Sequence, residues 1–314
     1  MKCDRNSTLF PTLSALSSLT LGLCLSTVPQ DASAQSILTP DQTLGAESSR
    51  VERQIQPTPT DLITGGARRG QNLFHSFSDF NVGQGQAVYF SNPNGINNIL
   101  TRVTGGSVSN IDSILGVRGN ANLFIINPNG IIFGPDASLD VGGSFVATTA
   151  NAIQFNEQDS FSATSPQTSS LLSVQPSAFF FNQVNSGEIT NQSQAPFRSI
   201  GTAATGARTT TGLGVPEGKS LLLVGGTVNL DGGGVNSIFG RVEIASVQAG
   251  QTLGLNATDG ELALQSLPSV QAENINAQNA SVTNGSTSTT QGARGGLIRF
   301  QGKNLVLTNS SIIN

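Results

Sequence analysis

Short apolar bursts separated by glycine, asparagine and proline constrain the fold of this chain more than any other feature. Examples are Leu73-Phe74, Val88-Tyr89-Phe90, Ile111 to Val117 and, near the end of the chain, Leu305 to Leu307. Each burst is only two to seven residues long, and the next follows after about ten residues. The apolar residues do not follow the i, i+3, i+4 spacing of an amphipathic helix. The sequence therefore predicts an all-β fold made of short strands with tight corners.

This rhythm favours a solenoid of stacked β-coils over a globular β-sandwich. A sandwich usually has longer alternating strands and more charge on its solvent face, whereas only 11% of these residues are charged. Stacked coils place equivalent corners above one another, which favours ladders of Asn, Ser and Thr over like charges that repel. With about 20 residues in each coil, we expect about ten coils.

The first 34 residues have the order of a secretory signal peptide. Lys2 and Arg5 give a positive start, an apolar stretch runs from Leu13 to Leu25, and Ala32-Ser33-Ala34 is a small-residue cleavage site. We expect cleavage after Ala34 and export to the periplasm, followed by secretion or display on the cell surface. No later apolar run reaches the ~18 residues of a membrane-spanning helix, so the mature chain has no expected membrane span.

Loss of the signal peptide removes both cysteines, Cys3 and Cys24. The mature chain then offers no disulfide, no thiol nucleophile and no cysteine ligand for a metal. His75 is the single histidine, which excludes a metal site of several histidines, and we interpret it as a packed or hydrogen-bonding residue. We expect neither a metal nor another cofactor. The net charge of −4 argues against a nucleic-acid partner, which needs a basic face.

Two segments interrupt the strand rhythm. Residues 156–175 are mostly polar, and residues 201–219 are rich in Gly and Thr and are interpreted as an extended surface loop. Loops of this kind carry the variable surface of a solenoid. The strand pattern is still in progress at Asn314, so we expect a longer parent protein or a truncated product.

Two near copies of one turn motif follow apolar bursts. The first is Asn92-Pro93-Asn94-Gly95-Ile96, and the second is Asn127-Pro128-Asn129-Gly130-Ile131. Proline fixes one φ angle, Asn-Gly tolerates the positive φ of a tight reversal, and asparagine side chains bond backbone groups that the turn leaves unpaired. Each motif alone is a structural turn, but two of them in one exported β-chain are more specific.

These motifs resemble those of the N-terminal secretion domains of filamentous haemagglutinin-type exoproteins, the passengers of two-partner secretion. That family carries an NPNL motif and, further along, an NPNGI motif. The second motif here matches at all five positions, whereas the first has Gly95 in place of leucine. Three segments, Asn72 to Phe77, Leu123 to Ile126 and Leu221 to Gly226, also resemble sequences in the cell-surface branch of this family. The resemblance covers about residues 36 to 250.

The resemblance implies a right-handed parallel β-helix with an N-terminal cap and extra-helical strands. The domains expected from it are a signal peptide at 1–34, a secretion domain at 35–250 and the start of a repetitive β-helical shaft at 251–314. It also implies recognition by an outer-membrane β-barrel transporter with periplasmic POTRA-type modules. Carried onto this sequence, the residues implicated in secretion are Asn92, Pro93, Asn94, Asn127, Pro128, Asn129, Gly130 and Ile131. They either contact the transporter or only shape the fold, and we favour the second role.

Two alternative functions remain. A carbohydrate-active β-helix enzyme needs two converging carboxylates, and the nearest pair to the second motif is Asp136 and Asp140, which we interpret as solvated corners. A free-standing surface adhesin would bind a host-cell, glycan or bacterial surface ligand that no motif here identifies. We predict a secretion domain without catalytic residues.

Overall fold

The structure is a computed structural model. It describes residues 35–54, 59–155, 159–166, 174–182, 186–199, 208–258, 261–267, 272–284 and 296–313. The proposed signal peptide lies outside the described residues. Strands dominate, and the described part contains one 3₁₀ turn and no α-helix. It therefore holds no helix of the length and apolarity that crossing a bilayer requires.

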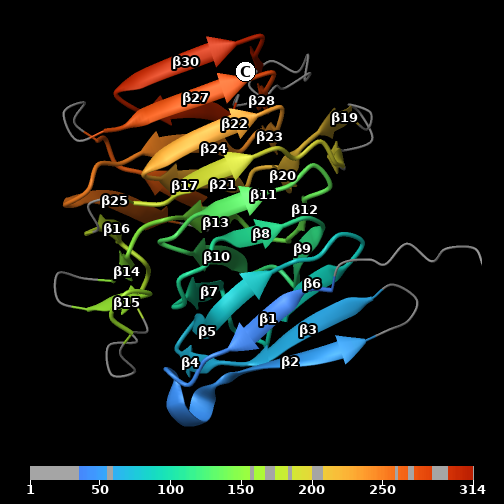
Figure 1. Ribbon diagram of the computed structural model, residues 1–314, viewed down its shortest axis with the longest axis vertical. Helices are drawn as coiled ribbons and strands as arrows, with labels where there is room; N and C mark the ends of the chain where they lie inside the picture. The colour runs from blue at the N-terminus through green and yellow to red at the C-terminus, as the bar shows by residue number, and fades with distance from the viewer. Residues whose placement is uncertain are drawn as a thin grey trace, which may run out of the picture. The chain divides into compact units, whose positions relative to one another are not determined.

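The chain winds through three faces of parallel strands, so that one coil contributes a strand to each face in turn (Figure 1). Face 1 consists of β5 (Asn72–Asn81), β7 (Asn98–Val103), β10 (Asn122–Ile126), β13 (Phe145–Thr148), β21 (Ser220–Gly225), β24 (Arg241–Ser246) and β29 (Leu297–Gln301). Face 2 consists of β8 (Ser109–Ile111), β11 (Ile131–Phe133), β17 (Glu188–Asn191), β22 (Thr227–Asp231), β27 (Asn274–Gln278) and β30 (Asn304–Thr308). Face 3 consists of β3 (Thr60–Gly65), β6 (Ala87–Ser91), β9 (Ile114–Arg118) and β12 (Ser138–Asp140), then β20 (Leu213–Val215), β23 (Gly234–Ser237), β28 (Ser281–Thr283) and β31 (Ser311–Ile313). The arrangement is a parallel β-helix, as the sequence predicts.

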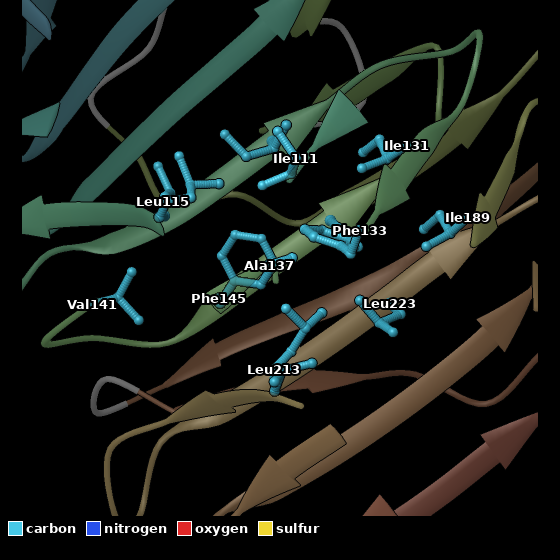
Figure 2. Close-up of a cluster of buried hydrophobic side chains, with 14 of the residues drawn as sticks. Ile111, Leu115, Ile131, Phe133, Ala137, Val141, Phe145, Ile189, Leu213 and Leu223 are labelled. Carbon is cyan, nitrogen blue, oxygen red and sulfur yellow. The ribbon is translucent and has the colours of Figure 1, made fainter. Parts of the chain in front are cut away.

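Apolar side chains stack in register through the interior of the helix. Leu73, Ile99, Leu123 and Phe145 are successive register partners on face 1, and all four are buried. Figure 2 shows side chains of the other two faces, such as Ile131, gathered in the same interior cluster. Each coil therefore adds apolar area to one continuous core, which is the main favourable free-energy change of folding.

The predicted ladders occur at the start of the face 1 strands. The Asn98 side-chain NH₂ donates to Asn72 Oδ1 at 2.9 Å, and the Asn122 NH₂ donates to Asn98 Oδ1 at 2.9 Å. Asn122 Oδ1 then accepts from the Ser144 backbone N–H at 2.8 Å. Stacked amides satisfy one another at the corner of successive coils, which confirms the predicted preference for polar ladders over charges.

The N-terminal cap closes the first coil with antiparallel strands. It consists of β1 (Ile37–Pro40), the 3₁₀ turn η1 (Gly45–Glu47), β2 (Ser49–Gln54) and β4 (Ala67–Arg69). β1 and β4 pair with β5, while β2 pairs with β3. The cap covers strand edges that would otherwise be open to pairing with another chain.

Two excursions leave the coils. The extra-helical sheet consists of β15 (Ser160–Ser162), β14 (Ala152–Gln154), β16 (Ala178–Phe181), β25 (Gln251–Thr258) and β26 (Glu261–Leu264), in that spatial order, and the second excursion is the hairpin β18 (Pro196–Ser199) and β19 (Arg208–Thr211). A second apolar cluster, which includes Phe74, Phe124, Phe161 and Phe179, packs the extra-helical sheet against the outer side of face 1. The predicted cap and extra-helical strands are both present (Figure 1).

Three expectations from the sequence were wrong. The segment 201–219 is not a single loop, because it contributes β19 and β20, and Leu213 and Val215 are buried in the core. The burst from Ile111 to Val117 is two strands, β8 and β9, with a corner between them that has no Gly or Pro signal. Face 1 stacks seven parallel strands in the described residues instead of about ten, because the excursions take up chain between coils.

Candidate functional site

The second Asn-Pro-Asn turn forms the corner between β10 on face 1 and β11 on face 2. Asn127 is completely buried. Its side-chain NH₂ donates to the Ser107 carbonyl at 3.0 Å and to Ser109 Oγ at 2.9 Å, which belong to the preceding coil. Its Oδ1 accepts from the Asn129 backbone N–H at 3.0 Å. Asn127 therefore both closes its own turn and fastens it to the coil before.

The rest of this turn extends the same connections. The Asn129 side-chain NH₂ donates to the Gly105 carbonyl at 2.7 Å, and the Pro128 carbonyl accepts from the Gly187 N–H of the next coil at 2.9 Å. Gly130 has φ +128°, and a Cβ there would lie 3.1 Å from the Glu188 carbonyl. Only glycine fits without strain, so the motif joins three successive coils.

A cavity of about 260 Å³ lies beside this turn. Pro128 and Asn129 line it together with Val103 to Gly106 and with Ala163 and Thr164 next to the extra-helical strand β15. The turn is therefore not wholly enclosed, and half-buried Asn129 is its side chain nearest the surface.

The first Asn-Pro-Asn turn lies at a different corner, between β6 on face 3 and β7 on face 1. With the Asn92 amide oriented to satisfy its neighbours, its oxygen accepts from the backbone N–H groups of Asn120 at 3.2 Å and Ala121 at 3.1 Å. Pro93 and Asn94 are exposed, as is Gly95. One residue thus anchors this turn to the next coil while its tip faces solvent.

The near-identical motifs are not equivalent positions of successive coils. Gly95 has φ +78°, a conformation that a leucine would adopt only with strain, so the departure from the NPNL pattern suits this backbone. Ile96 and Ile131 both point into the interior and are buried. The structure therefore separates a buried turn that joins coils from an exposed turn that presents its tip.

A buried polar network surrounds Arg102, which no motif in the sequence predicts. This side chain is fully buried on β7. Its guanidinium donates to Ser76 Oγ at 2.9 Å, to Thr43 Oγ1 at 2.8 Å and to the Ser162 carbonyl at 2.9 Å. Burial lowers the pKa of Arg102 to about 10, partly countered by Asp41. Arg102 thus connects β7 of the β-helix both to the cap, through Thr43, and to the extra-helical sheet, through Ser162.

Asp41 completes this network from the cap. Its carboxylate accepts from Thr104 Oγ1 at 2.6 Å, Thr43 Oγ1 at 2.6 Å and Ser76 Oγ at 2.7 Å. Burial opposes its ionisation, but these hydrogen bonds together hold the pKa of Asp41 below its ordinary value. In the sequence, Asp41 and Thr43 form an Asp-x-Thr pair just before the 3₁₀ turn η1. This pair indicates a local turn but does not predict a contact with the distant Arg102.

His75 is packed in the core, as the sequence predicts. It is fully buried, and its Nδ1 lies 3.0 Å from Ser49 Oγ in the cap. Burial lowers the pKa of His75 to about 3, so the ring is neutral at neutral pH. The buried neutral ring on β5 therefore has a structural role, in contact with the cap.

The two carboxylates of the enzyme alternative have separate partners. Asp136 accepts a hydrogen bond from Gln84 Nε2 at 2.9 Å. The pKa of the nearby Asp112 is raised, because Asp112 is partly buried and because Asp136 is also negatively charged. Asp140 instead accepts from the Tyr89 hydroxyl at 2.7 Å. Both Asp136 and Asp140 are exposed, as the solvated-corner interpretation expects.

Most of the chain matches a known protein family. The family described as the TPS secretion domain, where TPS denotes two-partner secretion, matches residues 36–310. The heme/hemopexin-binding protein of Haemophilus influenzae is 34% identical over 93 residues, which cover 30% of this chain and 9% of that protein. The chain thus matches only a small part of this curated relative.

One of two solved structures compared with this chain shares its architecture. The HMW1 secretion domain from Haemophilus influenzae superposes with a TM-score of 0.51 and 18% identity, covering 89% of this chain and 66% of that one. The filamentous hemagglutinin secretion domain gives a TM-score of 0.39 and 14% identity, covering 88% of this chain and 96% of that one. At this identity the HMW1 likeness shows a common fold.

Proposed function

Since this chain belongs to the family of TPS secretion domains, we propose that it directs a larger, adhesin-like protein across the outer membrane. A dedicated β-barrel transporter recognises it through periplasmic POTRA-type modules. The observation that carries this proposal is the family match along residues 36–310. Residues 1–34 act as the cleaved signal peptide, residues 35–250 as the recognised domain and residues 251–314 as the start of the shaft.

We assign different roles to the two Asn-Pro-Asn turns. Asn127, Pro128, Asn129, Gly130 and Ile131 act by shaping the fold, which is supported by the burial of Asn127 and its bonds to adjoining coils. Pro93 and Asn94, with Asn92 as their anchor, form the turn offered to the transporter, which is supported by their exposure.

Release into the medium tests this division of roles. The chain would be expressed with and without its cognate transporter, as wild type, as Asn127→Ala/Asn129→Ala and as Pro93→Ala/Asn94→Ala. We expect transporter-dependent release of the wild type. The first double variant should lose both release and stability, because it removes buried hydrogen bonds.

The exposed variant separates recognition from folding. Pro93→Ala/Asn94→Ala should keep its urea midpoint, because neither side chain is buried, and should still lose release. Normal release of this variant would assign both motifs to the fold alone. Wild-type release without any transporter would reject two-partner secretion and leave a self-sufficient exported β-helix.

We further infer that the domain acts without catalysis, which distinguishes it from β-helix enzymes that cleave polysaccharides. Support comes from the separate partners of Asp136 and Asp140 and from the burial of His75. Assays on a panel of acidic and neutral polysaccharides should detect no cleavage. Cleavage that disappears in Asp136→Asn would reinstate the enzyme alternative.

A further inference from the structure

Face 3 is divided where the β18–β19 excursion interrupts the coils. β12 pairs with β9 and β20 pairs with β23, but β12 and β20 are not paired with each other in the described part of the chain. A cavity of about 420 Å³ lies at this division, lined by residues of β12, of β20 and of the start of β18.

Two glycines let aromatic rings lie close against the outer surface here. A Cβ on Gly116 would come within 2.4 Å of the Tyr89 ring, and a Cβ on Gly214 would come within 2.3 Å of the Phe197 ring. Tyr89 and Phe197 both line the cavity. Gly116 and Gly214 thus leave space for the Tyr89 and Phe197 rings, which form part of the cavity wall. Aromatic walls of this kind are typical of preformed ligand sites.

Both charged residues that line the cavity in the described part of the chain are acidic. Asp140 and Glu217 line it, both are exposed, and no ion pair engages either carboxylate within the described ranges. Asp140 accepts the Tyr89 hydroxyl at 2.7 Å. A ligand cation would therefore meet two carboxylates that no described ion pair neutralises.

The geometry disfavours a sugar as the occupant. The Arg118 guanidinium covers one face of the Tyr89 ring, 3.7 Å from its centroid, and Gly116 lies against the ring as well. Tyr89 therefore has no free face on which a pyranose ring could stack. Half-buried Phe197, with exposed Pro216 nearby, provides an apolar wall that suits the aliphatic stem of a long basic side chain.

We propose that this cavity binds an arginine side chain of an extended partner peptide. The stem lies along Phe197 and Pro216, and the guanidinium meets Asp140 and Glu217. Arginine fits better than lysine because its planar guanidinium binds carboxylates through a fork of donors. The partner is a protein segment in which apolar residues flank the arginine, since Ile114 and Leu139 also line the cavity. The site is independent of the two Asn-Pro-Asn turns.

Tyr89 supplies the readout, because the chain has one tyrosine and no tryptophan. The full chain would be titrated with acetyl-Val-Arg-Val-amide while tyrosine fluorescence is followed. A matched peptide with citrulline in place of arginine keeps the shape and removes the charge. We expect a saturable change with the arginine peptide at millimolar concentration or below, weakened at least about tenfold with citrulline.

Matched variants locate the site. Asp140→Asn and Glu217→Gln should each weaken binding several-fold, whereas Asp136→Asn, which removes an exposed carboxylate outside the cavity, should not. No saturable change up to about 10 mM, equal binding of the citrulline peptide, or equal weakening by Asp136→Asn would each overturn the proposal. A saturable response to chitobiose or maltose without one to the arginine peptide would identify a saccharide site instead.

Discussion

At the scale of single residues, the single histidine makes the fold sensitive to acid. The folded state holds His75 neutral with a pKa of about 3, whereas the unfolded chain protonates it near its ordinary pKa of 6.5. Below pH 6.5 the unfolded state therefore binds more protons. The stability that neutral His75 provides is complete above pH 6.5 and is lost as the pH falls toward 3, by up to about 1.4 kcal/mol per pH unit.

Urea unfolding between about pH 4 and pH 7 checks this, with His75→Phe as the comparison. Carboxylates such as Asp41 contribute to the pH dependence of both proteins, so the difference between the two slopes isolates His75. We expect the variant to lose less stability on acidification, whatever its stability at neutral pH. Parallel curves would show that His75 is not protonated on unfolding.

Arg102 illustrates what residue-level reasoning from sequence leaves out. Nothing in the local sequence of β7 distinguishes a buried arginine from an exposed one, because its acceptors come from residues about 60 positions away on either side: Thr43 and the Ser162 carbonyl. A buried guanidinium is tolerated only when its donors are satisfied. That condition depends on the assembled fold, so no spacing within one strand could predict it.

At the scale of elements, the ladder of asparagines contributes to the pairing of successive coils. Asn98 is buried, bonds the amides of Asn72 and Asn122, and donates to Gln175 Oε1 at 2.8 Å. Asn98→Ala should lower the free energy of unfolding by about 2–3 kcal/mol, since it removes three hydrogen bonds of a buried amide. Asn94→Ala on the exposed turn should change it by less than about 0.5 kcal/mol. Urea denaturation of both variants decides this, and equal effects would mean that the ladder adds nothing specific.

The strands were predictable where apolar residues and turn residues alternate, and not elsewhere. Leu123 to Ile126 is bounded by turn signals and is β10, as expected. Leu213 to Val215 lies in a Gly/Thr-rich segment whose composition predicts a surface loop. It forms a strand instead, because the side chains of Leu213 and Val215 are buried in the core. The second Asn-Pro-Asn turn was identified from its motif, but its bonds to Gly105 and Gly187 were not, because they join separate coils.

At the scale of the whole molecule, the coils and the extra-helical sheet depend on distant parts of the chain. β16 pairs with β14 on one side and with β25 on the other. Leu253 and Leu255 on β25 and Leu262 and Leu264 on β26 are buried in the second apolar cluster. The sheet is therefore completed only by residues that follow position 250, and a domain boundary there stays a prediction.

Two truncated chains test that boundary, one covering residues 35–250 and the other residues 35–267. Both contain the coils as far as β24, so their difference isolates β25 and β26. Since each fully buried leucine contributes about 1.5–3 kcal/mol as an upper estimate, we expect the shorter chain to be less stable by at least about 3 kcal/mol. It should also bind a hydrophobic dye through the part of the second apolar cluster that β25 and β26 cover in the full chain. Equal urea midpoints and no dye binding would show instead that residues 35–250 fold as a complete domain, with the strands after them added as part of the shaft.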